Sequence, residues 1–112
     1  MKWIDVFKRH RKVAAVYEKN GELESLTFSL DYRRSRINWE EEDRLYLCFH
    51  PNVSQRTISP LVKALKTKKP VAVFRKVSPD NWEEIGLHRV VEQMTGKDAL
   101  GRDSIVFAVS PA

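Results

Sequence analysis

The chain has 112 residues, of which 42% are hydrophobic and 31% are charged, and its formal net charge is +5 at neutral pH. No apolar run approaches the ~20 residues that cross a bilayer, and neither a secretory leader nor a lipidation motif is visible. Cys48 is the only cysteine, which excludes an internal disulfide and a zinc cluster built on thiolates. We therefore expect one cytoplasmic domain over residues 1–112, with a single modest core and no membrane partner.

The first part of the chain predicts a short helix and then a β-hairpin. Trp3, Val6 and Phe7 are spaced as one apolar face of a helix. The strand-like runs 12–19 and 22–30 flank Asn20-Gly21, a pair that favours a type I′ turn because both of its residues need positive φ. In the second run, alternate residues predict an apolar face and a polar face, formed by Leu26, Phe28 and Leu30 and by Ser25, Thr27 and Ser29, respectively.

The middle of the chain predicts two strands and one helix. A short strand is expected over 37–39 and a buried strand over 44–49. Ser59 as the N-cap and Pro60 as the first helical residue predict the start of the helix, which Pro70 would end. Four residues of this helix form one apolar stripe, namely Ile58, Leu61, Val62 and Leu65.

The last part of the chain predicts three more strands. They are expected over residues 71–76, 82–91 and 104–109, joined by a turn at 78–81 and a loop at 95–103. Gly86 would form a bulge or a close backbone approach in the second of them. The whole pattern predicts an α+β fold with a β-rich, mainly antiparallel small barrel or strongly curled sheet and one or two short helices.

The positive charge is concentrated in one stretch. No carboxylate side chain lies between Asp43 and Asp80, and residues 44–79 carry eight basic side chains, so the remainder of the chain has a net charge of −3. A localised positive field suits a polyanion, most often nucleic acid. With few acids nearby in the sequence, the basic residues would converge on a groove for the sugar–phosphate backbone. The candidate phosphate-binding residues are Arg33, Arg34, Arg36, Arg56, Lys63, Lys66, Lys68, Lys69, Arg75 and Lys76. The alternative for the helix lysines is that they only solvate its outer face.

Three aromatic residues lie in polar, turn-like surroundings and are candidates for stacking on a base. They are Tyr32, Trp39 and Trp82. Such a stack contributes ~1–3 kcal/mol per base. For the two tryptophans a role in covering the core is an equal alternative, since tryptophan is usually well buried.

No constellation of residues indicates catalysis, a cofactor or a metal. His10, His50 and His88 are scattered, and Cys48 next to His50 lacks a partner motif. The acidic run 40–43 could suggest a metal-dependent nuclease, but consecutive acids on a loop splay outward, so a solvated face or pairing with Arg33, Arg34 and Arg36 is favoured. We expect a protein that is not an enzyme.

The segment from Pro70 to Val91 resembles part of a PUA-like barrel of the SRA and EVE type. The similarity rests on Pro-Val-x-Val-x-Arg at 70–75, and on Trp82 followed by Gly-Leu-x-x-Val at 86–90. These families read modified bases and often accompany restriction systems. The resemblance implies nucleic-acid binding with a base flipped into an aromatic pocket, framed by the unit that contains Arg75, Trp82 and Gly86. The chain departs from the family where Glu84-Ile85-Gly86 replaces an aromatic–Asp–Gly, and it is short for a complete SRA domain.

Two functions follow from these patterns. The first is a nucleic-acid-binding domain that binds DNA in preference to RNA. It would hold phosphates in a basic groove and contact a base, and its biological role would be host defence. The alternative is a protein-interaction or inhibitor module of a phage or host-defence type, whose basic face meets an acidic protein partner.

Overall fold

The computed structural model describes residues 1–30 and 38–112, and these form two helices and seven strands. In chain order the elements are α1 (Trp3–His10), β1 (Val16–Lys19), β2 (Glu22–Phe28), β3 (Trp39–Glu41), β4 (Arg44–Phe49), α2 (Gln55–Thr67), β5 (Val71–Ser78), β6 (Asn81–Lys97) and β7 (Asp103–Pro111). None of the helices in the described part of the chain is long and apolar enough to cross a membrane.

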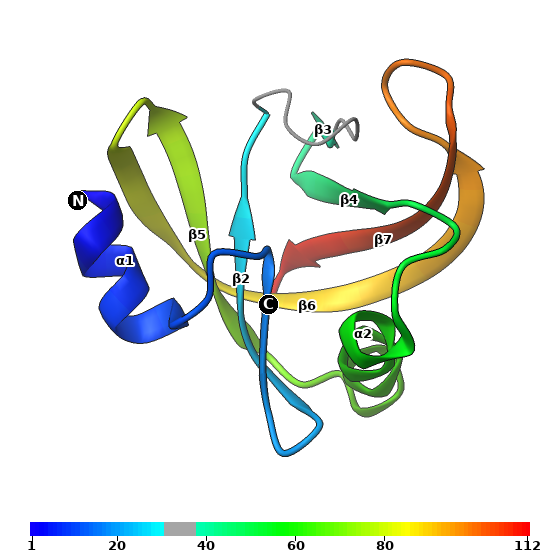
Figure 1. The fold of residues 1–112 in the computed structure, drawn as a ribbon, viewed down its shortest axis with the longest axis horizontal. Coiled ribbons are helices and arrows are strands. Elements are labelled where there is room, and N and C mark those ends of the chain that lie inside the picture. Colours follow the sequence, from blue (N-terminus) through cyan, green and yellow to red (C-terminus); the bar gives the residue numbers. More distant parts are fainter. Residues whose placement is uncertain (31–37) are drawn as a thin grey trace.

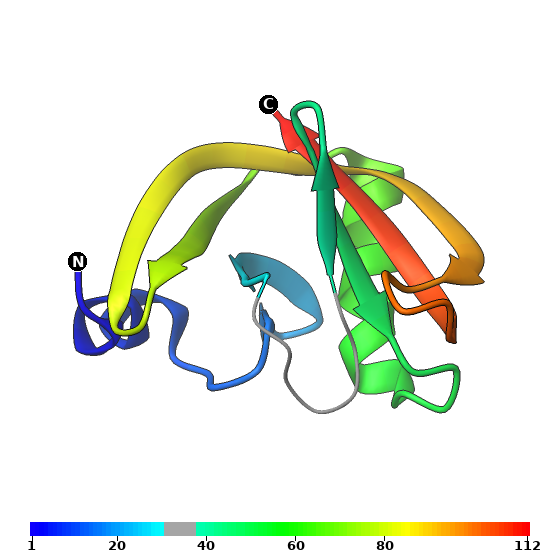
Figure 2. The same cartoon turned by 90° about the horizontal axis from the view of Figure 1, so that it is seen from above.

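The strands form one sheet in the order β1-β2-β5-β6-β7-β4-β3. Every neighbouring pair is antiparallel except β2 and β5, which run parallel. The sheet curls strongly without closing: β6 follows its outer curve and β2 lies inside it (Figures 1 and 2). The predicted α+β class and curled sheet are therefore confirmed.

Strand β6 is long enough to pair with β5 along one half and with β7 along the other (Figure 1). Two bulges bend it. Ile85 and Gly86 together oppose Val73, and Val91 is the extra residue where β6 pairs with β7. Gly86 has φ +87°, a conformation that L side chains rarely adopt. The predicted bulge at Gly86 is thus confirmed, and bulges of this kind increase the local twist that curls the sheet.

The β1–β2 hairpin turns at Asn20 and Gly21, as predicted. Their φ angles are +55° and +79°, the positive pair that a type I′ turn requires. The carboxylate of Glu18 accepts a hydrogen bond from the Gly21 amide at 2.8 Å. This turn fixes the register that brings the side chains of β2 against α2.

Helix α2 begins at Gln55, five residues before the predicted first residue, with Ser54 at the N-cap position. Pro60 therefore lies inside the helix and is buried against the sheet. The prediction was wrong because Ser-Pro is only a local start signal, whereas the buried stripe that includes Ile58 and Leu61 extends the helix through tertiary packing. Lys68, at φ +57°, ends the helix in a left-handed conformation.

Two groups of apolar side chains form the core. The larger group lies between α2 and the sheet, with Phe28, Leu61 and Phe107 fully buried. The smaller group lies under α1 and contains Val6, Phe74 and Trp82. The short N-terminal helix is therefore confirmed, but Phe7 of its predicted apolar face is exposed, because the helix packs on the sheet through Trp3 and Val6.

The polar face of β2 is buried rather than exposed, because α1 and the segment after it cover it. Ser25 and Thr27 are both buried. The Oγ atom of Ser25 lies 2.7 Å from Nδ1 of His10, and the Thr27 amide donates to the Ala15 carbonyl at 2.9 Å. Leu30, in contrast, is 49% exposed because β2 ends at Phe28. The loop predicted at 95–103 is also shorter than expected, since β6 continues to Lys97.

Candidate nucleic-acid interface

An ion pair spans the inside of the curled sheet. Arg75 of β5 and Glu40 of β3 come from strands that are not neighbours, and Nη1 of Arg75 donates to Oε2 of Glu40 at 2.9 Å. The two side chains are 32% and 26% exposed. Water therefore screens the pair less than it screens a surface ion pair. We call this region, between the ends of β2 and β5 and strand β3, the mouth of the sheet.

Asn38 connects two strands across the same mouth. Its Nδ2 atom donates to the carbonyl of Ser29, just after β2, at 3.3 Å. Its Oδ1 atom accepts a hydrogen bond from the Cys48 amide of β4 at 2.9 Å. The open sheet is thus held together across the mouth by side chains.

A cavity of about 290 Å³ lies beside the ion pair. Its lining combines cationic, anionic and apolar side chains: Leu30, Arg75, Lys76, Val77, Ser78 and Glu83. The volume is near the lower end of the range for small-molecule sites, ~300–1,000 Å³. The cavity is therefore small, and charged and apolar groups both line it.

A second cavity, of about 280 Å³, lies on the side of β5 nearer to α1. It is lined by Trp3, Val13, Thr27, Lys76, Asp80 and Trp82. Lys76 contributes to the lining of both cavities.

Several solved structures share this fold. The complex of the SUVH5 SRA domain with methylated CHH DNA superposes with a TM-score of 0.74 at 20% identity, over 100% of this chain and 84% of the other. The SUVH5 SRA domain bound to fully hydroxymethylated CG DNA gives a TM-score of 0.68 at 20% identity, over 98% and 82%. The modification-dependent TagI restriction endonuclease gives 0.73 at 15% identity, over 97% of this chain but 46% of its own. The chain has the fold of an SRA domain.

The sequence itself gives no closer relationship. No family model matches the chain, and none of the curated proteins matches it. The resemblance read from residues 70–91 is confirmed at the level of the SRA fold, and it corresponds to β5 and most of β6. Within the SRA fold Arg75 faces the mouth, Trp82 lies in the core under α1, and Gly86 forms the bulge of β6 four residues after Trp82.

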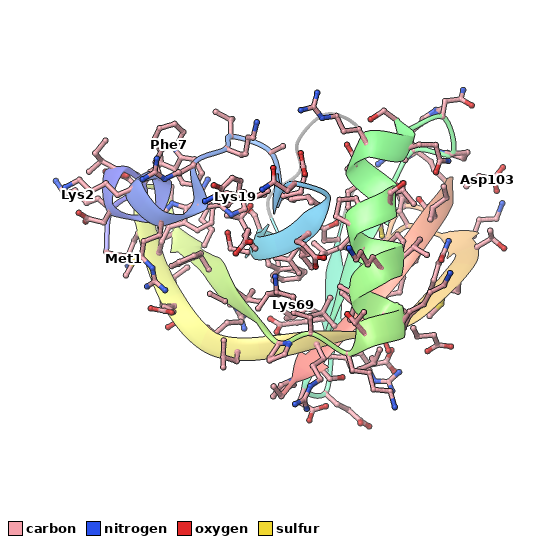
Figure 3. All side chains as sticks on the ribbon, turned by 90° about the horizontal axis from the view of Figure 1, so that it is seen from below. Met1, Lys2, Phe7, Lys19, Lys69 and Asp103 are labelled. Carbon is pink, nitrogen blue, oxygen red and sulfur yellow. The ribbon has the colours of Figure 1, made fainter. Side chains whose placement is uncertain are left out.

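The basic side chains of α2 do not form an unopposed field. Strand β2 lies beside α2 (Figure 3), and carboxylates of the β1–β2 hairpin pair with cations of α2 and of the segment directly after it. Three contacts are formed, namely Arg56 with Glu18 at 3.7 Å, Lys63 with Glu22, and Lys69 with Glu24 at 3.8 Å. The Lys63 ammonium hydrogen-bonds to Glu22 and lowers the pKa of that carboxyl. The expectation of few acids near these lysines was therefore wrong.

This pairing could not be found from distance along the sequence, because the glutamates lie more than thirty residues before the lysines. One signal was present: Glu22 and Glu24 alternate on a strand and so share a face. Lys66 and Lys68 are exposed, and neither forms an ion pair with a carboxylate of the described residues. Arg33, Arg34 and Arg36 lie outside the described residues.

The aromatic candidates fall into different environments. Trp39 is half-buried and stacks on Tyr46 with ring centroids 4.6 Å apart and planes at 5°. Trp82 is only 9% exposed and packs on Trp3 at 5.1 Å. The core role left open for Trp82 is thus the one that its burial supports. Trp39 precedes Glu40 on β3, and its ring lies with Tyr46 on the face of the strand opposite to that of Glu40. Tyr32 lies outside the described residues.

Sequence reasoning missed the cations of α1 and the residues after it. The sequence-based prediction of this helix considered only its apolar side chains. The cations at its end and directly after it are Lys8, Arg9, Arg11 and Lys12. Arg9 forms a two-pronged pair with Glu84, at 2.5 Å and 2.9 Å, and its guanidinium lies 4.9 Å from the centre of the Phe74 ring. This hydrogen bonding lowers the pKa of Glu84 and raises the pKa of Arg9.

Among the described residues no group of three or more His, Cys, Asp or Glu side chains could hold a metal ion.

Proposed function

We propose that this chain is a DNA-binding domain that recognises a modified base at the mouth of its curled sheet. The observation that carries the proposal is the cavity beside Arg75 and Glu40, in a chain whose entire length follows the SRA fold. The solved structures with this fold include complexes of the SUVH5 SRA domain with methylated and with hydroxymethylated DNA. We extend that ligand class to this chain.

The mouth supplies the groups that a base requires. The guanidinium of Arg75 and the carboxylate of Glu40 offer donors and acceptors side by side, and both are partly withdrawn from water. Hydrogen bonds in such a setting discriminate strongly, because a mismatched base leaves a polar group unpaired. Trp39 and Tyr32 are kept as stacking candidates, and Trp39 would meet a base on the face of β3 opposite to that of Glu40. Trp82 is buried under α1, and we propose that it packs in the core there and does not contact a base.

Phosphate contacts complete the proposal. Lys76 borders the cavity, and Lys66 and Lys68 extend from the end of α2. The three arginines of 31–37 remain candidates beside them. Arg56, Lys63 and Lys69 would have to exchange a glutamate for a phosphate, which is feasible because exposed ion pairs contribute only ~0–1 kcal/mol.

We also propose that the domain binds DNA without cleaving it. The TagI endonuclease, of which this chain spans about half, is described as modification-dependent, so a reading domain can accompany a separate nuclease. A role in host defence would follow from such an arrangement. Incubation of modified DNA with this chain and Mg²⁺ should leave the DNA intact, and cleavage that persists through repurification would contradict this part of the proposal.

Fluorescence anisotropy tests the proposal directly. Matched duplexes with cytosine, 5-methylcytosine or 5-hydroxymethylcytosine would be titrated beside single strands and RNA across a salt series. We expect saturable binding with tighter affinity for a modified duplex, and we expect Arg75→Gln to remove the preference while most of the affinity remains. The matched control is Lys97→Gln, which lies at the far end of β6. Equal affinity for all three duplexes would refute base reading, and no binding at ~50 mM salt would refute DNA binding altogether and favour an acidic protein partner.

A further inference from the structure

Helix α1 and the two residues after it carry cations that are not neutralised by neighbours. Lys8, Arg11 and Lys12 are exposed, and among the described residues no carboxylate forms an ion pair with any of them. Asp5, the acid of the helix, accepts a hydrogen bond from the Lys2 amide at 3.1 Å and serves as a cap. The contrast with α2 is plain, because there three of the cations meet glutamates of the β1–β2 hairpin.

The helix is fixed firmly to the part of the sheet that borders the mouth. Val6 is completely buried, and Trp3 packs on Trp82. The Trp3 amide donates to Asp80, in the β5–β6 turn, at 2.9 Å. The two-pronged contact of Arg9 with Glu84 holds the other end of the helix to β6. The cations of α1 are therefore presented at a fixed distance from the mouth, and no large loss of conformational freedom is required to use them.

The outer side of α1 also carries exposed apolar side chains. Ile4 is 59% exposed and Phe7 is 39% exposed. Phe7 points away from the sheet and Lys2 points outward from the start of the helix (Figure 3). An apolar strip bordered by cations fits a DNA strand, whose phosphates take the charges and whose sugar rings provide apolar contact.

We propose that α1 and the segment to Lys12 form a second contact with the DNA backbone, separate from the mouth. Lys76 connects the two regions, since it lines both the cavity of the mouth and the cavity beside α1. The inference rests on the proposed function, because it places the flanking duplex of the same DNA on this helix. In this arrangement the mouth determines which base is preferred, and α1 determines how strongly affinity depends on salt.

The test removes three charges from α1 and compares the result with an equal loss elsewhere. The variant is Lys8→Gln, Arg11→Asn and Lys12→Gln. Asn is chosen for Arg11 because that residue has φ +60°, which Asn tolerates. The matched control is Lys19→Gln, Arg44→Gln and Lys97→Gln, which has the same net charge but spreads the losses over the ends of three other strands. Thermal melting of both variants shows whether each is folded.

We expect the α1 variant to reduce the slope of log affinity against log salt by about 2–3, since each lost phosphate contact removes ~0.9. Affinity at ~0.1 M salt should fall by roughly 10²-fold. The ratio of affinities for modified and unmodified duplexes should not change. The control variant should change the slope by less than about 1.

Several outcomes would overturn the inference. An α1 variant with the same slope as the control would do so. A second such outcome concerns vesicles of anionic phospholipid. If the wild type binds them, and the α1 variant does not bind them but keeps the wild-type salt slope for DNA, the helix would serve a membrane surface. The two proposals can fail separately. If the wild type binds DNA without a base preference and the α1 variant has a reduced salt slope, base reading is refuted and the α1 contact is supported.

Discussion

The ion pair of Arg75 with Glu40 should make a measurable contribution to stability because it joins strands that do not otherwise pair. Two opposite charges ~4 Å apart attract by ~4 kcal/mol at an effective dielectric constant of ~20, before desolvation and side-chain ordering are subtracted. Exposed pairs retain only ~0–1 kcal/mol, whereas removal of one partner from a buried pair costs ~3–5 kcal/mol. With side chains 32% and 26% exposed, this pair lies between the two limits. We expect a coupling energy of about 1–2 kcal/mol.

A double-mutant cycle measures that coupling. Glu40→Gln, Arg75→Gln and the double variant would be unfolded in urea, with the free energy of unfolding extrapolated to water. Each single variant should lose about 1–2 kcal/mol, and the double variant should lose less than the sum of the two. The coupling should decrease only slightly in 0.5 M salt, since the pair is partly shielded from solvent. A coupling below ~0.3 kcal/mol would refute the view that the pair braces the mouth, because that value is within the additivity of independent sites.

Three further predictions concern stability. Gly86→Ala should cost about 1–2 kcal/mol through backbone strain alone, because φ is +87° and no atom lies within 4 Å of an added Cβ; an unchanged melting temperature would contradict this. Trp82→Ala should lower the free energy of unfolding by about 3–5 kcal/mol and Trp82→Phe by clearly less, because the indole fills the space under α1. Equal losses of stability in the two variants would argue against packing as the cause. Burial lowers the pKa of His10, so the unfolded chain binds more protons than the folded one below pH ~6.5, and stability should fall as the pH decreases through that range. Urea titrations from pH 5 to 7.5 should show a flatter profile for His10→Gln, and an equally steep profile would assign the dependence to another group.

Much of the fold could be predicted because its signals are local. Asn20-Gly21 specifies a turn whose backbone angles only a few residues adopt, and Gly86 interrupts a strand pattern in the way that bulges do. The apolar stripe through Ile58 and Leu61 identified α2, although its first residue was placed too late. These features depend on residues that are neighbours along the chain.

The charge pattern of the interface could not be predicted in the same way. Neutralisation of Lys63 by Glu22 depends on how α2 packs over β2, which is a tertiary fact. For the same reason, Ser25 was expected on an exposed face but is covered by His10. The site residues of the mouth are brought together by strand order, since Arg75 and Glu40 lie in strands separated by three others. Sequence alone identified Arg75 and the acidic run, but not their contact.

The parallel pairing of β2 with β5 limits the order in which the chain can fold. Strands β3 and β4 and helix α2 all lie between these two strands in the sequence. Hairpins such as β1–β2 and β5–β6 close short loops, whereas the β2–β5 pair must first bring distant segments together at a larger cost in chain entropy. We expect the hairpins to form early and the central pairing late. The mouth needs β2, β5 and β3 in place together, so the proposed DNA binding should be the last property that the refolding chain acquires.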